Sequence, residues 1–149
     1  MERIITAIKV QKRNPNRVNI DLDGEFAFGL SRLVAAWLKP GDTLSEEKIN
    51  SLIEKDVLEV AYLRALDLLN HRPRSEKEIR HRLVDKGFQP EQIDQVISKL
   101  KQANLVRDEA FARMWVESRN EFHPRSSKLL RYELRNKGIA ERHIDTALK

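Results

Sequence analysis

The stretch Pro73-Arg74-Ser75-Glu76-Lys77-Glu78-Ile79-Arg80-His81-Arg82-Leu83-Val84-Asp85-Lys86-Gly87 is the key to the chain, because much of it returns fifty-one residues later. Aligned without a gap, residues 73–98 match residues 124–149 at ten of twenty-six positions. Self-similarity at a fixed period is typical of repeat architectures, in which each copy is one supersecondary unit. We therefore predict two tandem copies of one helical unit.

Each copy carries the signals of a helix start and a helix end. Ser75 and Ser126 are predicted N-caps, and Glu78 follows Ser75 at the spacing of a capping box. Gly87 and Gly138 stand where a helix ends on a left-handed residue, and each follows a lysine that suits the negative end of the helix dipole. These signals predict that the middle helix of each unit has the same bounds in both copies.

Apolar residues at helical spacing extend the unit to three helices. Before each Pro-Arg-Ser the pattern predicts a helix, over residues 57–71 and 108–122, and after each glycine it predicts another. The predicted inward residues of the middle and last helices are Ile79, Leu83, Ile93, Val96, Ile97 and Leu100 in the first copy and Leu130, Leu134, Ile144, Ala147 and Leu148 in the second. The repeat is thus a three-helix unit of about fifty residues.

The residues ahead of the repeats alternate in hydropathy and contain turn residues. Residues 4–10 and 17–28, broken at Asn14-Pro15-Asn16 and Asp23-Gly24, predict a small antiparallel sheet of three short strands. Residues 31–38 predict a short helix capped by Ser31, and a helix opening at Ser45 either continues into the first repeat or bends near residue 55. We expect Trp37, Phe26 and Phe28 in the core of this module.

The predicted fold is mainly α: tandem three-helix repeats, elongated and curved, preceded by a small antiparallel β-hairpin module. We place the module at residues 1–56, the first repeat at 57–104 and the second at 105–149. A hinge is expected at residues 104–107 or near residue 55.

Composition excludes several functional classes. The chain lacks cysteine, has no apolar run long enough to span a membrane and has no Gly-rich phosphate loop, and its four histidines show no metal-ligand spacing. We expect a cytoplasmic protein that is not an enzyme and that needs no cofactor and no metal ion. With 40% hydrophobic residues, 149 residues suffice for a core.

The net charge of +5 lies in the repeats, because residues 1–56 carry nine basic and nine acidic residues whereas residues 57–149 carry nineteen and fourteen. Basic residues recur in register on the middle helices, which favours an acidic or polyanionic partner. The candidate binding residues are Arg74, Lys77, Arg80, Arg125, Lys128, Arg131 and Arg135. A solvated outer face would also explain them, and Arg74 or Arg125 could instead fix the turn before its helix. Trp115 is assigned to packing, because it lies next to apolar positions.

The order of these motifs resembles the bacterial RecX regulatory proteins. The resemblance rests on Arg-Pro-Arg-Ser-x-x-Glu-Ile-Arg-x-x-Leu-x-x-Lys-Gly, on the helix start at residues 108–112, and on the strand sequence of residues 16–29, and it covers nearly the whole chain. It implies a non-catalytic modulator of the RecA recombinase, with a place in DNA repair, homologous recombination and the SOS response. We expect the chain to be a monomer. Such proteins bind the RecA filament on single-stranded DNA and inhibit ATP hydrolysis, strand exchange and filament extension.

One departure and two alternatives stay open. The family usually has three such units, so a third repeat is absent from this sequence, which would weaken a modular grip. Residues 75–101 are also similar to a helix-turn-helix pair, so a direct DNA-binding module is one alternative. A helical adaptor for another protein is the other.

Overall fold

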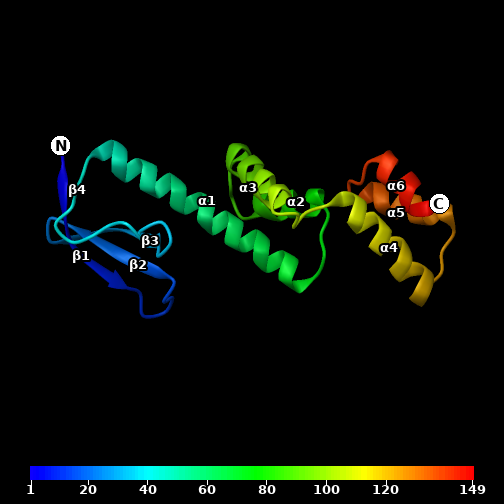
Figure 1. The fold of residues 1–149 in the computed structure, drawn as a ribbon, viewed down its shortest axis with the longest axis horizontal. Coiled ribbons are helices and arrows are strands. Elements are labelled where there is room, and N and C mark those ends of the chain that lie inside the picture. Colours follow the sequence, from blue (N-terminus) through cyan, green and yellow to red (C-terminus); the bar gives the residue numbers. More distant parts are fainter. The chain divides into compact units, whose positions relative to one another are not determined.

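The computed structural model describes all 149 residues and confirms the mainly α fold with a small N-terminal sheet (Figure 1). The strands are β1 (Arg3–Val10), β2 (Arg17–Leu22), β3 (Glu25–Ser31) and β4 (Thr43–Leu44). The helices are α1 (Glu46–His71), α2 (Glu76–Asp85), α3 (Pro90–Gln102), α4 (Asp108–Phe122), α5 (Ser127–Asn136) and α6 (Glu141–Leu148). None of these helices combines the length and the apolar character that crossing a bilayer requires.

Contacts divide the chain into two compact units, Met1–Val60 and Ala61–Lys149. The helix α1 belongs to both, and it is one uninterrupted helix. Of the two alternatives for the helix that opens at Ser45, the continuous one is therefore found.

The first unit is an antiparallel sheet with the strand order β3-β2-β1-β4. Asp23 and Gly24 both have positive φ, 52° and 87°, which is the geometry of the tight turn predicted between β2 and β3. The prediction of three strands missed β4, which has only two residues. The core of this unit joins the sheet to the turn after it and to the start of α1, and its buried members are Ile5, Val18, Ile20, Leu22, Leu30, Ala35, Leu44 and Leu52.

Asp56 fixes the sheet to α1 within this unit. Its carboxylate accepts two bonds from the Arg17 guanidinium, at 3.2 and 3.0 Å, and one from the backbone N–H of Ser31 at 2.7 Å. Because Asp56 is only 8% exposed, this paired arrangement is what makes its burial tolerable.

The prediction of a helix over residues 31–38 is wrong, because the segment forms successive turns. Ser31 does cap its start, since the Ser31 Oγ accepts a bond from the Val34 N–H at 3.2 Å. The burial of two aromatic residues in this unit is also predicted wrongly: Trp37 is 90% exposed and Phe26 63%. Phe28 is half-buried and packs against the core.

The second unit contains both repeats, with the predicted caps in place. Ser75 and Glu78 form the capping box, and the Ser126 hydroxyl accepts a bond from the Leu129 N–H. Gly87 and Gly138 have φ of 91° and 79°. Each ends its helix in a Schellman motif, closed by the bonds Gly87 N–H to Val84 O, Phe88 N–H to Leu83 O, Gly138 N–H to Arg135 O and Ile139 N–H to Leu134 O.

Each repeat has a core of its own, built from the predicted inward residues. The first contains Ala61, Ala65, Ile79, Leu83, Ile93, Val96, Ile97, Leu100 and Val106. The second contains Phe111, Ala112, Val116, Leu130, Leu134, Ile139 and Ile144, with Trp115, Ala147 and Leu148 partly buried against it. Trp115 stacks on Phe111 at a ring-centroid distance of 5.9 Å, which confirms its packing role.

Candidate functional site

Two of the candidate arginines bridge the middle and last helices of their repeats. The Arg80 guanidinium contacts the Glu76 carboxylate at 2.9 Å and the Asp94 carboxylate at 2.7 Å. Its pKa is raised, chiefly by the hydrogen bond to Asp94. In the first repeat, this arginine therefore joins α2 to α3.

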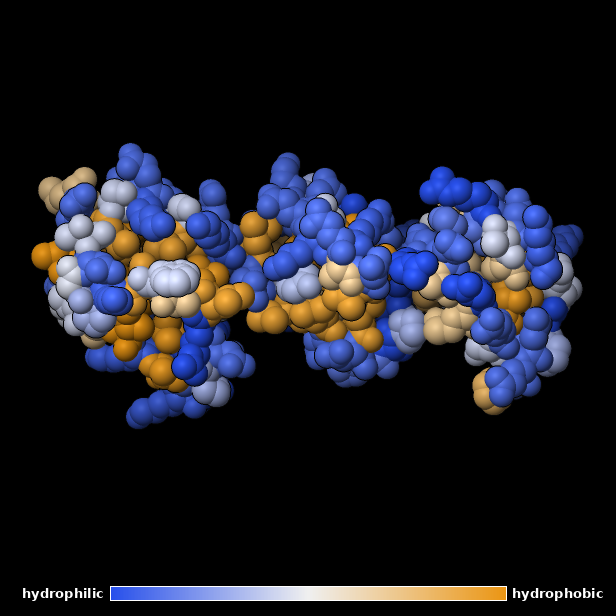
Figure 2. All heavy atoms as spheres, viewed as in Figure 1, coloured by the Kyte–Doolittle hydropathy of each residue, from blue (hydrophilic) through white to orange (hydrophobic).

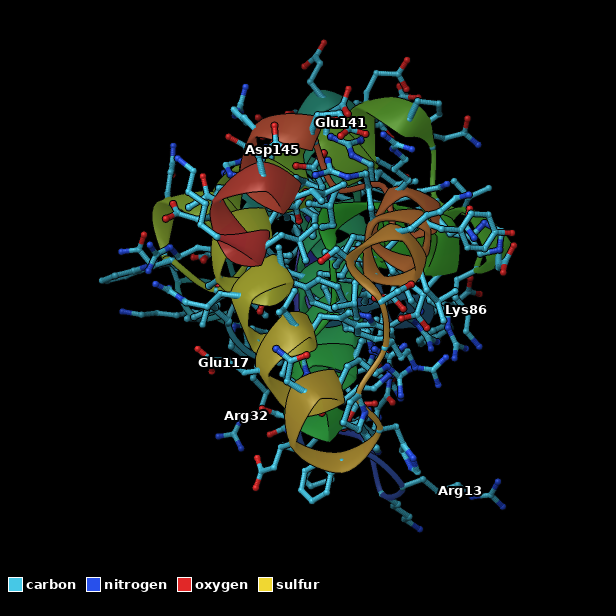
Figure 3. The ribbon with its side chains drawn as sticks, turned by 90° about the vertical axis from the view of Figure 1, so that its right-hand side faces the viewer. Arg13, Arg32, Lys86, Glu117, Glu141 and Asp145 are labelled. Atoms are coloured by element: carbon cyan, nitrogen blue, oxygen red, sulfur yellow. The ribbon has the colours of Figure 1, made fainter.

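The second repeat forms the same bridge. Arg131 lies 2.8 Å from Glu141 and 2.7 Å from Asp145, and Figure 3 shows both acids on the same side of α6. The pKa of Arg131 is raised by these bonds, first by that to Asp145. Arg135 also binds Glu141, so the charges of both arginines are compensated by α6.

Two candidates in the first repeat bind backbone carbonyl groups. The Arg74 Nε donates to the Leu68 carbonyl at 3.3 Å, which fixes the turn before α2, and burial is the first cause of its lowered pKa. The Lys77 ammonium donates to the Asn136 carbonyl at 3.4 Å. Lys77 thus connects α2 to the end of α5.

A set of polar contacts joins the two repeats at this point. The Lys137 ammonium lies 3.1 Å from the Glu78 carboxylate, which also holds Arg72 at 2.6 Å. From the other side, the Asp108 carboxylate accepts a bond from the N–H of Glu76 at 3.1 Å. We call the contacts of Glu78 and Lys137 the inter-repeat clasp.

The clasp changes the acidity of its central carboxyl group. Burial opposes ionisation of Glu78, but the hydrogen bonds from Arg72, the Ser75 N–H and Lys137 outweigh it and lower the pKa to about 2. Asp108 shows the opposite balance: burial raises its pKa more than the bond from the Glu76 N–H lowers it. Glu78 is therefore the charged centre of the contact between the repeats.

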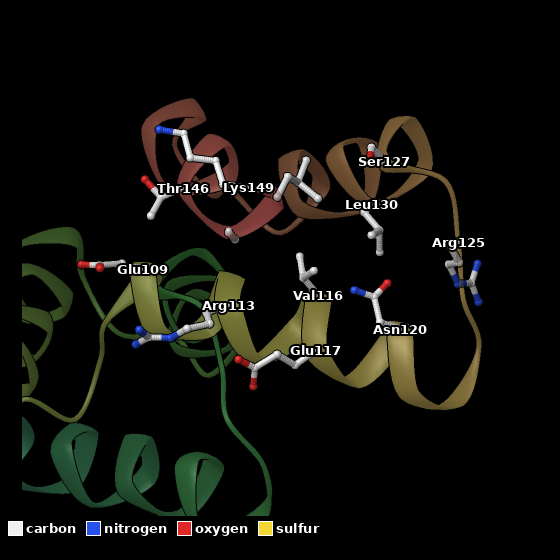
Figure 4. Close-up of a pocket in the computed structure, with 12 residues that line it drawn as sticks. Glu109, Arg113, Val116, Glu117, Asn120, Arg125, Ser127, Leu130, Thr146 and Lys149 are labelled. Atoms are coloured by element: carbon white, nitrogen blue, oxygen red, sulfur yellow. The ribbon is translucent and has the colours of Figure 1, made fainter.

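Arg125 borders a groove of about 410 Å³ between α4, the start of α5 and the end of α6 (Figure 4). Val116 and Leu130 point toward one another across it, whereas Arg125 stands in the linker at one end. The Arg125 guanidinium lies 3.6 Å from Glu133, which also receives the indole N–H of Trp115 at 3.4 Å. The charge of Arg125 is therefore partly compensated by Glu133 of α5.

Lys128 is the candidate whose charge is fully available, because it is exposed and forms no ion pair. The middle helix of the first repeat offers two further cations of this kind, Arg82 on the exposed face of α2 and Lys86 at its C-cap. Figure 3 shows Lys86 on a different side from Glu141 and Asp145. Sequence reasoning missed Arg82 and Lys86, although their spacing of four residues on a helix whose inward face was known was a usable signal.

The fold and its contacts define a class: a tandem three-helix repeat protein with an N-terminal sheet module and outward-facing basic helices. Three family models match it in order. Residues 3–45 match the regulatory protein RecX N-terminal domain, residues 61–100 the RecX first three-helix domain and residues 108–148 the RecX second three-helix domain. The chain belongs to the RecX family.

Individual relatives agree with this assignment. The chain is 37% identical over 146 residues to the regulatory protein RecX of Bacillus pumilus, covering 97% of this chain and 56% of the relative. It is 32% identical over 139 residues to that of Clostridium perfringens strain SM101, covering 92% and 65%. A crystal structure of regulatory protein RecX superimposes with a TM-score of 0.85 at 32% identity, over 98% of this chain and 72% of that one.

A second structure, of RecX from Lactobacillus salivarius, matches 63% of this chain and 61% of its own with a TM-score of 0.61 and 26% identity. The chain spans about half the length of the first curated relatives it matches.

Proposed function

We propose that the chain is a non-catalytic regulator that binds the RecA filament on single-stranded DNA and inhibits its ATPase, strand exchange and filament extension. The observation that carries this proposal is the match to three RecX domains in family order. The charge distribution supports it, since the unit Ala61–Lys149 has nineteen basic and thirteen acidic residues. Such a surface suits a filament built from protein and phosphate backbone.

We assign two roles to the basic residues. Lys128, Arg82 and Lys86 are exposed and unpaired and belong to the middle helices or to the end of one, where basic residues are concentrated, so we assign them as the direct contacts. Arg80, Arg131 and Arg135 are engaged with acids of the following helix, and Arg74, Lys77 and Arg125 with neighbouring groups of their own unit. This second group contributes by holding the helices that present the contacts.

The test is the ATPase of RecA on single-stranded DNA, with this chain added below the RecA concentration. The unsubstituted chain should inhibit the ATPase. The triple variant Arg82→Glu, Lys86→Glu and Lys128→Glu should reach the same inhibition only at a concentration at least about tenfold higher. The reason is that exposed interface charges contribute roughly 0.2–1 kcal/mol each and that charge reversal adds repulsion. Unchanged inhibition by the variant would refute the assigned contacts, and lack of inhibition by the unsubstituted chain would refute the function.

A matched control separates a local surface from the overall charge. Arg64, Arg113 and Arg142 are exposed, unpaired cations on α1, α4 and α6. Reversing these three changes the net charge by the same amount, and inhibition should stay within about twofold if the faces of α2 and α5 are the contacts.

The direct DNA-binding module gives a different outcome in the same assay set. A protein that binds phosphates alone should bind bare single-stranded DNA with an affinity that falls steeply with salt. Tight binding to bare DNA together with an unaffected ATPase would favour that alternative.

A further inference from the structure

The segment between β3 and β4 in the unit Met1–Val60 is amphipathic. The Ala35 N–H donates to the Ser31 carbonyl at 3.0 Å and the Leu38 N–H to the Ala35 carbonyl at 3.0 Å, so the segment winds in successive turns. Ala35 is buried and Leu38 packs against the core. Leu33 and Trp37 are exposed and are not part of that core.

Two large apolar side chains of this segment are exposed to solvent, although burying them would favour folding. Trp37 is 90% exposed and Leu33 69%. Figure 2 shows hydrophobic side chains gathered on the face of this unit that is in view. Large apolar side chains that stay exposed on a folded protein are the raw material of interaction sites, and tryptophan is enriched among the interface residues that dominate affinity. We call Leu33 and Trp37 the apolar patch.

The apolar patch lies in a basic part of the sequence. Arg32 and Lys39 flank it in sequence, and residues 31–41 contain no acidic residue. The Arg32 N–H donates to the Asn16 carbonyl at 2.8 Å, which brings Arg32 to the loop that carries Lys12 and Arg13. None of these four cations forms an ion pair. The complementary surface is therefore an apolar recess with acidic residues at its rim.

The patch fits a protein better than a nucleic acid. The unit Met1–Val60 has nine basic and ten acidic residues, so it lacks the excess positive charge that binding to phosphates requires. Leu33 adds contact area that a nucleobase cannot use for stacking. An apolar centre that contains an aromatic side chain, within a polar rim, is instead a composition found in protein interfaces.

We propose that the apolar patch is a second docking surface, by which the N-terminal module binds the recombinase protomers of the filament rather than their DNA. This inference rests on the proposed function and extends it. Trp37 would insert into an apolar recess of the protein partner, and Arg32 and Lys39 would face acidic residues around it. The basic helices of the other unit and this patch would then bind one filament through two separate contacts.

The test compares Trp37→Ala with the unsubstituted chain in binding to immobilised RecA filaments on single-stranded DNA and to the same DNA without RecA. Because Trp37 is almost fully exposed, the variant should keep the thermal stability of the parent chain. We expect filament binding to weaken by at least about 30-fold, the size of a dominant interface residue, with binding to bare DNA unchanged. The control is Phe122→Ala, which removes another exposed aromatic ring, 67% exposed, from the other unit and should bind within about twofold of the parent chain.

Each contrary outcome has a distinct meaning. If the parent chain binds the filament and Trp37→Ala binds within about twofold of it, this inference fails and the proposed function stands. An equal loss on bare DNA would overturn the choice of a protein partner in favour of base stacking. A parent chain that sediments as a dimer, with a monomeric Trp37→Ala variant, would show that a second copy covers the patch. If the parent chain does not bind the filament at all, the proposed function fails and this inference falls with it.

Discussion

Neutralising Glu78 should loosen the contact between the two repeats without disturbing the helix cap. The substitution Glu78→Gln keeps an oxygen that can accept the Ser75 N–H, now bonded at 3.2 Å. It removes the charge that holds Arg72 at 2.6 Å and Lys137 at 3.1 Å. The variant therefore isolates the electrostatic part of the inter-repeat clasp.

The size of the effect follows from the acidity of the carboxyl group. A pKa lowered from 4.5 to about 2 corresponds to about 3 kcal/mol in the free energy of unfolding at neutral pH. Water around the partly exposed Arg72 and Lys137 screens both pairs, which reduces the expected loss to about 1–2 kcal/mol. Because the pKa is lower in the folded state, this stabilisation is complete above pH 4.5 and disappears as the pH falls toward 2.

The assay is urea unfolding of the parent chain and Glu78→Gln at pH 7 and at pH 3. The variant should be less stable at pH 7, and the difference should shrink at pH 3. The matched control is Glu121→Gln, since Glu121 is an exposed glutamate of α4 without an ion pair and should change stability by less than about 0.5 kcal/mol. Equal stability of the two variants at pH 7, or a difference that does not depend on pH, would refute the reasoning. A double-mutant cycle with Lys137→Met should assign about 0.5–1 kcal/mol to that one pair.

Two further pairs of substitutions test the repeats at their turns and caps. In urea unfolding, Gly138→Ala should cost about 2–3 kcal/mol and Gly87→Ala about 1–2 kcal/mol. Both glycines have positive φ, but only at Gly138 would an added Cβ meet another side chain, that of Lys77 in α2, at 2.6 Å. Equal costs would contradict the steric argument. Ser75→Ala should destabilise by about 1–2 kcal/mol and Ser126→Ala by about 0.5–1 kcal/mol, because Ser75 is fully buried whereas Ser126 is exposed, where water can replace the lost bond. The order of the two urea midpoints checks this.

The sequence alone predicted those parts of the structure that depend on residues close together in the chain. The serine caps and the glycine ends rely on backbone geometry within one turn of the helix, so Ser75, Ser126, Gly87 and Gly138 could be assigned before any packing was known. The inward faces of the repeat helices followed from spacing alone. These local signals agree with the fold in both copies.

Local sequence signals gave wrong predictions where contacts with residues distant in the sequence determine the structure. Residues 31–38 have helical hydropathy, but so short a segment cannot sustain a helix without support. The segment is instead bound at both ends by the sheet, through the bonds Arg32 N–H to Asn16 O and Gly41 N–H to Ile5 O. The apolar character of Trp37 also assigned it to the core, because apolar character alone cannot distinguish a side chain that packs inside from one that stays exposed.

Some ion pairs of the candidate site could have been predicted from the sequence repeat. Arg80 and Arg131 recur fifty-one residues apart, and so do their partners Asp94 and Asp145. Two recurring residues of opposite charge on adjacent helices predict a contact as well as a surface, and interpreting only the arginines as a binding stripe overlooked this.

The comparison of the two copies separates scaffold from surface. Residues that are identical in both, such as Ser75, Arg80 and Gly87, cap helices, join them or end them. Several positions outside the core differ between α2 and α5: His81 corresponds to Tyr132, Val84 to Arg135, and the exposed Arg82 to Glu133, which binds Arg125 and the Trp115 indole. At Ser75, Arg80 and Gly87 recurrence therefore marks residues that build the unit. The lysine pairs 77/128 and 86/137 also recur, but Lys77 and Lys137 bind groups of the other repeat, whereas Lys128 and Lys86 are exposed without an ion pair. Two units on one scaffold can then contact different parts of a composite partner, which is what a filament of protein and DNA would require.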